Sequence, residues 1–100
     1  MVIDDGSTDQ TSEVLSVYQD RPDFHYLKNP HNIGAAASRN RGVQEAHGQY
    51  VAFLDADDWW ENGKLLLQLD TLHETGRVLC STGRELMNYD GTPAGKIYSR

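Results

Sequence analysis

The sequence predicts an α/β domain with a mainly parallel sheet and flanking helices. One observation is that short apolar segments alternate with segments in which apolar residues recur at helical spacing. A second is that aspartates directly follow two of the short apolar segments, at Asp4 and Asp5 and again from Asp55 to Asp58. Because parallel strands end at one edge of a sheet, where ligands bind, the two acidic segments are expected to meet there.

The first third of the chain predicts two strands joined through a helix. Residues 2–3 read as the end of a buried strand, which Gly6 breaks. A helix over 8–19 has apolar residues at helical spacing, and Ser7 to Asp9 offer side chains that cap helix N-termini. The short apolar segment 24–27 is the second strand.

The middle of the chain predicts a helix followed by another strand. The helix covers 34–46, and its first turns contain three consecutive alanines. Such small side chains permit a close approach to a sheet or to a ligand. Residues 49–54 are almost entirely apolar and predict a buried strand that leads into the second acidic segment.

The last third of the chain predicts a helix, a strand and a hairpin. Asn62 and Gly63 open the helix, its leucines form an apolar side, and Gly76 ends it. Residues 78–80 form a short strand, in which Cys80 is expected to be a buried small side chain. The hairpin strands 85–89 and 96–99 flank the turn 90–93.

Charge and composition exclude several classes of function. The net charge of −6 argues against binding to nucleic acid, which requires a basic face. The mean hydropathy of −0.64 and the absence of a long apolar run argue against a membrane span in this chain. The single cysteine cannot form an internal disulfide, which fits a reducing compartment such as the cytoplasm.

The acidic segments are typical of a site for a divalent cation. Crowded carboxylates need a neutralising charge, and a Mg²⁺-type site often uses one or two carboxylates with phosphates and water. In an extended loop Asp55 and Asp57 point to the same side, so one carboxylate could bind the metal while the other holds a hydroxyl. The alternative is that these aspartates only form turns and caps, with Asp58 preceding the next helix.

Three ordered motifs carry a resemblance to a known family. Residues 2–9 read V-I-D-D-G-S-T-D, residues 32–42 read N-I-G-A-A-A-S-R-N-R-G, and residues 48–58 read G-Q-Y-V-A-F-L-D-A-D-D. Together with Trp60 and Lys64 they resemble glycosyltransferase family 2, whose members are inverting enzymes with a GT-A, Rossmann-like fold. Ser38 stands where the family pattern usually has alanine.

The resemblance implies a role for each residue of a nucleotide-sugar site. Asp5 would bind the base of the nucleotide, which is expected to be uracil. Asp4 would either support Asp5 or only shape the turn. Asp55 would contact the ribose or the donor sugar. Asp57 would be the ligand of Mg²⁺ or Mn²⁺ at the diphosphate. Arg39 would either approach the nucleotide or form an ion pair with one of the aspartates.

The resemblance also implies an activity. This is metal-dependent transfer of a sugar, with inversion, from a nucleotide diphosphate donor such as a UDP-sugar to an acceptor hydroxyl. The acceptor would be a carbohydrate, a lipid-linked glycan or a protein glycan, as in polysaccharide biosynthesis. The expected location is cytoplasmic, or the cytoplasmic face of the membrane for the full-length protein.

Residues 1–100 resemble only part of such a domain. The family's first strand is expected before Met1, and the acceptor side, with the carboxylate base, is expected after the hairpin. No residue of this sequence is assigned as that base. The alternative function is therefore a catalytically inactive, truncated fragment that at most binds nucleotide or metal. A nucleotidyltransferase is disfavoured, because such an enzyme normally has a glycine-rich basic loop and no such loop is visible in residues 1–100.

Overall fold

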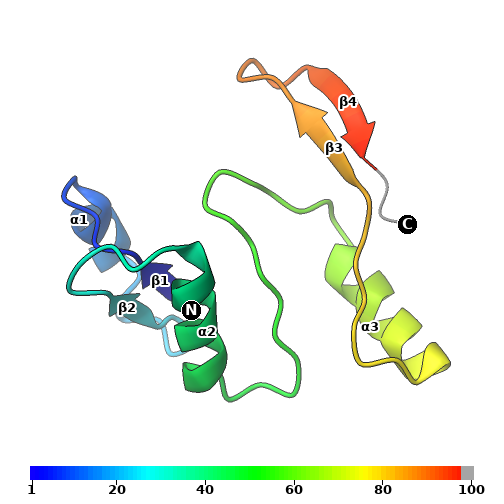
Figure 1. Ribbon diagram of the computed structural model, residues 1–100, viewed down its shortest axis with the longest axis horizontal. Helices are drawn as coiled ribbons and strands as arrows, with labels where there is room; N and C mark the ends of the chain where they lie inside the picture. The colour runs from blue at the N-terminus through cyan, green and yellow to red at the C-terminus, as the bar shows by residue number, and fades with distance from the viewer. Residues whose placement is uncertain (98–100) are drawn as a thin grey trace. The chain divides into compact units, whose positions relative to one another are not determined.

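The computed structural model describes residues 1–97 and divides the chain into two compact units (Figure 1). One unit comprises residues 1–55, and the other begins at Ala56. The elements in chain order are β1 (Val2–Asp4), α1 (Thr11–Ser16), β2 (Tyr26–Lys28), α2 (Ala35–Glu45), α3 (Lys64–Thr75), β3 (Arg84–Met87) and β4 (Pro93–Ile97).

The first unit is built on the parallel strand pair β1 and β2. Ile3 lies opposite Leu27, and Asp4 lies opposite Lys28 as the last pair of the ladder. Both strands therefore end at the same edge, and the residues that follow them, Asp5 and Asn29, leave the sheet side by side. This confirms the predicted order of strand, helix and parallel strand, and it positions the first acidic segment at a strand end.

Helix α2 packs against β1 in the same unit. The contact is close because residue 42 is glycine: a Cβ there would lie 3.5 Å from Cγ1 of Ile3. The predicted close approach of the three alanines at 35–37 is not seen, because all three are exposed, and Gly42 makes the close contact with the sheet instead. Its bounds, Ala35–Glu45, agree with the predicted range to within one residue at each end.

Helix α1 is shorter than predicted. It begins at Thr11 rather than at residue 8, because the Asp9 carboxylate accepts hydrogen bonds from the backbone N–H of Thr11 (3.0 Å) and from its hydroxyl (2.5 Å). The aspartate therefore organises the turn that leads into the helix. The helix ends at Ser16, and a series of turns follows it.

The second unit contains α3 and an antiparallel hairpin. Helix α3 is bounded by Gly63 and Gly76, both with left-handed backbone conformations (φ 82° and 63°). Strands β3 and β4 pair from Arg84 opposite Ile97, with an irregularity between Leu86 and Met87. The hairpin is confirmed, although the predicted strand residues 98 and 99 lie outside the described residues.

Two predicted strands are absent from the structure. Residues 49–54 and 78–80 have irregular backbone, and neither segment is buried. Val78, for example, is 97% exposed. A strand forms only where a neighbouring strand accepts its hydrogen bonds, and no strand within residues 1–97 pairs with either segment. The apolar composition of the two segments therefore wrongly predicted that they are buried. Cys80, which was expected to be buried, is only half-buried.

The best-buried residues of the described chain are polar. No apolar side chain among residues 1–97 is fully buried, whereas Asp4, Asn29 and Ser38 are. These three residues come from β1, from the end of β2 and from α2, so the interior of the first unit is a hydrogen-bonded cluster. Within the same described residues no helix has the length and apolar character needed to cross a membrane.

Candidate functional site

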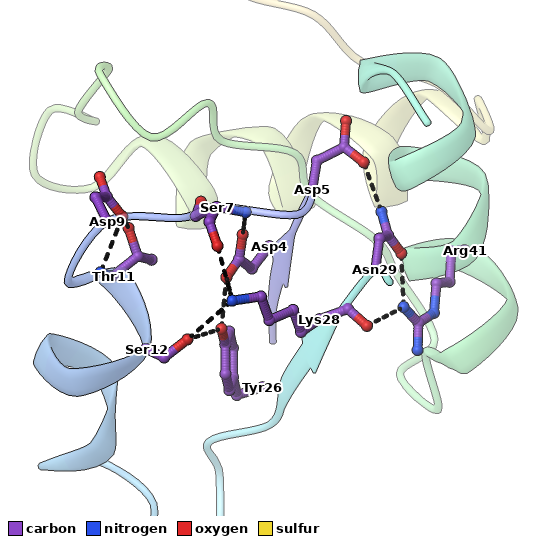
Figure 2. A network of polar contacts seen from close by, with 10 residues as sticks. All are labelled: Asp4, Asp5, Ser7, Asp9, Thr11, Ser12, Tyr26, Lys28, Asn29 and Arg41. Atoms are coloured by element: carbon purple, nitrogen blue, oxygen red, sulfur yellow. Dashed lines mark hydrogen bonds and ion pairs between the residues drawn. The ribbon is translucent and has the colours of Figure 1, made fainter. Parts of the chain in front are cut away.

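Asp4 ends β1 with its side chain completely buried. Its Oδ1 accepts a hydrogen bond from the backbone N–H of Ser7 at 2.7 Å, and its Oδ2 accepts one from the Tyr26 hydroxyl at 2.5 Å. The Lys28 ammonium lies 3.8 Å from Oδ2 and donates to the backbone oxygen of Ser7 (Figure 2). Both oxygens of Asp4 are thus used to hold the turn that follows β1 to the neighbouring strand.

The surroundings of Asp4 keep it ionised. Burial raises the pKa of this carboxyl, but the hydrogen bonds from Ser7 and Tyr26 and the charge of Lys28 outweigh that effect and bring the pKa to about 2. The same contact raises the pKa of Tyr26, since its hydroxyl donates to the carboxylate. Asp4 has no exposed side-chain surface, and its contacts shape the turn after β1, which is one of the two alternatives that the sequence left open.

Asp5 has its carboxylate directed at the loop before α2. Its Oδ1 accepts hydrogen bonds from the Asn29 side-chain amide and from the Ile33 backbone N–H, both at 2.8 Å. Its Oδ2 accepts one from the Gly34 N–H at 2.9 Å. The donors at Ile33 and Asn29 hold the pKa of Asp5 below its usual range, so the group is an ionised acceptor at neutral pH.

The carboxylate of Asp5 also serves the start of α2. Gly34 is the N-cap residue of that helix, and no side chain of its own segment caps it. A negative charge on N–H groups at a helix N-terminus is favourable. The three hydrogen bonds use three of the about four acceptor sites of a carboxylate, and the Ser38 hydroxyl also lowers the pKa of Asp5.

The turn after β1 is packed tightly against the loop before α2. Gly6 has a φ of +77°, and a Cβ there would lie 2.8 Å from the carbonyl carbon of His31 and 2.9 Å from the nitrogen of Asn32. Beside this contact lies an open depression of about 430 Å³ with a mainly polar lining, formed by Asp5, Gly6, Ser7, Thr8, Asp9 and Asn32. Its carboxylates favour ligand groups that donate hydrogen bonds.

Arg39 and Asp55 form an ion pair. Nη2 of Arg39, on α2, lies 2.6 Å from Oδ1 of Asp55, and both side chains are about half exposed. The sequence left two alternatives open for Arg39, and an ion pair with an aspartate is the one present in the structure. The pair brings the start of the second acidic segment to α2, within the first unit.

Asp57 and Asp58 lie in an exposed turn of the second unit. Neither carboxylate has a hydrogen bond or ion pair with any residue in the described range. The meeting of both acidic segments at one edge, expected from the sequence, therefore stays a prediction.

The residues present fit a divalent cation held mainly by substrate. Within residues 1–97 no group of three or more His, Cys, Asp or Glu side chains could hold a metal ion. A Mg²⁺-type site does not need such a group, because one exposed carboxylate can be completed by phosphate oxygens and water. Asp57, exposed and without a partner in that range, has the donor atoms that such a site requires.

The site is completed by three residues that the sequence did not single out, Asn29, Arg41 and Tyr26. Asn29 is 1% exposed, and its side chain contacts Asp5, Ser38 and Arg41. Tyr26 is the third, through its bond to Asp4. The available signal was position, because Asn29 directly follows the second strand, at the edge where the first acidic segment lies.

Comparison with known proteins supports one family. The model of the family described as glycosyl transferase family 2 matches residues 1–98. A putative teichuronic acid biosynthesis glycosyltransferase, TuaG, from Bacillus subtilis is 41% identical over 97% of this chain and 39% of its own length. The UDP-Glc:alpha-D-GlcNAc-diphosphoundecaprenol beta-1,3-glucosyltransferase WfaP of Escherichia coli is 37% identical over 99% of this chain and 39% of its own length.

A further relative shares the same region. An uncharacterized glycosyltransferase of Rickettsia felis is 35% identical over 99% of this chain and 16% of its own length. The chain therefore spans two fifths or less of the length of these relatives. No solved structure gives a significant match. The family match over nearly the whole chain, the relatives and the parallel α/β unit together show that this chain belongs to glycosyl transferase family 2, with its GT-A type of fold.

Proposed function

We propose that this chain forms the nucleotide-binding side of an enzyme that transfers a sugar, with inversion, from a UDP-sugar to an acceptor hydroxyl. The observation that carries the proposal is the state of Asp5. Its carboxylate is ionised, held by three donors, and borders the open depression after β1. An ionised carboxylate accepts hydrogen bonds, which suits a base that presents an N–H group.

The chemistry of Asp5 favours uracil. Uracil has an N–H at position 3 of its ring, whereas cytosine has an unprotonated nitrogen there. A carboxylate attracts the first and repels the second. The printed name of the Escherichia coli relative includes a UDP-sugar donor, which supports the same nucleotide for this chain.

The donor's diphosphate and sugar are assigned to the second acidic segment. Asp57 would hold Mg²⁺ or Mn²⁺, and when bound this cation stabilises the negative charge of the leaving diphosphate. Asp55 would contact the ribose or donor sugar once its partner Arg39 turns toward the nucleotide. Both side chains are about half exposed, which leaves them accessible to a ligand.

For the acceptor, only the chemical class is proposed. We assign none of residues 1–97 as the base that deprotonates the acceptor hydroxyl. The relatives' names mention teichuronic acid biosynthesis and a diphosphoundecaprenol-linked acceptor. They support a carbohydrate or lipid-linked acceptor in polysaccharide synthesis, at the cytoplasmic face of the membrane in the full-length protein.

Calorimetric titration of the purified protein with UDP, with and without Mn²⁺, tests the proposal. UDP is expected to bind more tightly with Mn²⁺, and Asp57→Ala is expected to remove that difference. Asp5→Ala should weaken UDP binding about 10- to 100-fold, as expected for a hydrogen bond to a charged group. Asp20→Ala, which removes an exposed aspartate in the turns after α1, is the matched control and should bind as the wild type does.

Two results would contradict separate parts of the proposal. Unchanged UDP affinity in Asp5→Ala would exclude Asp5 from the site. An unchanged Mn²⁺ effect in Asp57→Ala would exclude the metal assignment. Tight UDP binding without turnover of any UDP-sugar would favour the alternative function, a nucleotide-binding protein without catalysis.

A further inference from the structure

Asn29 occupies the centre of the polar cluster at the sheet edge. It follows β2 directly and is the best-buried large side chain among the described residues. Its amide nitrogen donates to Asp5 Oδ1 at 2.8 Å and to the Ser38 hydroxyl at 2.9 Å. Figure 2 shows its side chain between Asp5 on one side and Arg41 on the other. One residue thus connects the end of β1, the end of β2 and helix α2.

The orientation of the Asn29 amide is fixed by its neighbours. Arg41 Nη1 donates to Asn29 Oδ1 at 2.6 Å and also to the backbone oxygen of Lys28 at 3.0 Å. A guanidinium can only donate, and the ionised carboxylate of Asp5 can only accept. Only one orientation of the amide satisfies both, because the flipped amide would place two oxygens together and two donors together.

We propose that Asn29 is a positioning residue that acts through Asp5, orienting its carboxylate toward a nucleotide base with an N–H donor, and that Arg41 locks the Asn29 amide for this purpose. This inference rests on the proposed function of Asp5. Asn29 itself is buried and does not contact the ligand. Its effect would therefore be on the selection between bases, which depends on the direction of the Asp5 carboxylate.

The positions of the groups that donate hydrogen bonds to Asp5 support the positioning role of Asn29. Two of the three donors to Asp5 are backbone N–H groups of the loop before α2, at Ile33 and Gly34. Asn29 is the remaining donor, and it is anchored to the sheet by its backbone bond to Asp4 and to α2 through Ser38. Hydrogen bonds involving a charged group are stronger and more directional than neutral ones. Without Asn29 the carboxylate of Asp5 would lose its contact with the residue that follows β2, and the loop and the Ser38 hydroxyl would hold it.

A buried asparagine that only joins β2 to α2 would affect stability but would not discriminate between bases. The discriminating measurement is the ratio of UDP to CDP affinity, from calorimetry with Mn²⁺, in the purified wild-type protein and its variants. Asn29→Ala is expected to weaken UDP binding about tenfold while CDP binding changes less, so the ratio falls. In an Asp5→Ala background, Asn29→Ala should change UDP affinity by less than about twofold, because the residue through which it acts is gone.

Ser12→Ala is the matched control. It removes a side-chain hydrogen bond to Tyr26 in the same unit and leaves the Asn29–Asp5 bond intact. The ratio of UDP to CDP affinity should stay within about twofold of the wild-type value. An unchanged ratio in Asn29→Ala, or an equal loss of UDP affinity with and without Asp5, would overturn the positioning role.

Arg41 provides a second variant if Asn29→Ala does not fold, which circular dichroism would reveal. Arg41→Ala frees the Asn29 amide to flip and should lower the ratio at least about threefold, whereas Arg41→Lys retains a donor and should restore it. A wild-type ratio in a folded Arg41→Ala protein overturns the proposal.

If Asp5→Ala leaves UDP affinity unchanged, the proposed function of Asp5 fails and this inference fails with it. Asp5→Ala can instead weaken UDP binding while the Asn29 and Arg41 variants keep the wild-type ratio of UDP to CDP affinity. In that case only the positioning role of Asn29 fails.

Discussion

At the end of β1, two adjacent aspartates have opposite surroundings. Successive side chains of a strand point to opposite faces, so Asp4 enters the interior while Asp5 turns toward the loop before α2. Asp4 binds Ser7 and Tyr26 and holds the turn. Asp5 binds the Asn29 amide and the N–H groups of Ile33 and Gly34. The same residue type thus holds two different segments from neighbouring positions, the turn after β1 and the loop before α2.

Removal of the Asp4 carboxylate is expected to destabilise the protein. Asp4→Ala leaves the Tyr26 hydroxyl and the Ser7 N–H without their acceptor, at a cost of about 1–3 kcal/mol in the free energy of unfolding. Denaturant unfolding followed by circular dichroism measures this cost. Asp20→Ala is the control, and equal stability of the two variants would contradict the structural role of Asp4.

Asp4 also predicts how stability depends on pH. Its pKa is about 2 in the folded protein and 3.8 as an ordinary value. A depressed pKa contributes stability above the unfolded value, and that stability is lost as pH falls through the folded value. The free energy of unfolding should therefore fall between about pH 4 and pH 2, by on the order of 1 kcal/mol from this group. Asp4→Asn should flatten this decrease, and an unaltered pH profile in that variant would contradict the assignment.

At the scale of elements, the turn after β1 and the loop before α2 act as one packed edge. Gly6 makes their contact possible through both its positive φ and its missing side chain. Gly34, the N-cap residue of α2, also has a positive φ (91°), but a Cβ there would meet nothing within 4 Å. The two glycines therefore separate the cost of backbone conformation from the cost of a steric clash.

Gly6→Ala and Gly34→Ala form a matched pair. Gly34→Ala should cost about 1–3 kcal/mol, because its φ of 91° and ψ of 158° lie in a backbone region that is essentially restricted to glycine. Gly6→Ala should cost about 1–3 kcal/mol more, because the loop at His31 and Asn32 must also shift. Urea unfolding measures both variants. Gly6→Ala should also weaken UDP binding, since Asn32 borders the depression; equal stability of the two variants would be evidence against the packed edge.

The elements also show where a sequence pattern suffices. Helix α2 and the hairpin β3–β4 follow from local signals, which are consecutive alanines with flanking glycines and a turn containing Asp90 and Gly91. The segments 49–54 and 78–80 were wrongly predicted as strands, because a strand depends on partners far away in the chain. Asn29 was missed for a related reason: its role appears only when β1, β2 and α2 meet.

At the scale of the whole molecule, the chain consists of two units whose described residues bury no apolar side chain completely. The hydrogen-bonded cluster of Asp4, Asn29 and Ser38 is the best-protected part of the first unit. A ligand that binds the folded state and not the unfolded chain adds stability that rises with the logarithm of its concentration above the dissociation constant. The global stability of this protein is therefore a readout of its proposed site.

UDP with Mn²⁺ is expected to raise the unfolding temperature of the protein. At 100 times the dissociation constant, the added stability is about 2.7 kcal/mol. A thermal shift measured with a chelator, with Mn²⁺ alone and with UDP and Mn²⁺ together checks this expectation. Asp57→Ala should lose the part of the temperature shift that requires UDP and Mn²⁺ together. A shift equal to that of the wild-type protein would contradict the metal assignment.

The contact at Gly6 has a consequence for which sequences this edge tolerates. The atoms nearest to residue 6 are the backbone carbonyl carbon and Cα of His31 and the backbone nitrogen of Asn32. A main chain passes through the same space whatever side chain it carries. Position 31 can therefore accept many amino acids, whereas position 6 accepts glycine alone. A substitution at position 31 leaves its main chain in place, so it does not make room for a side chain at position 6.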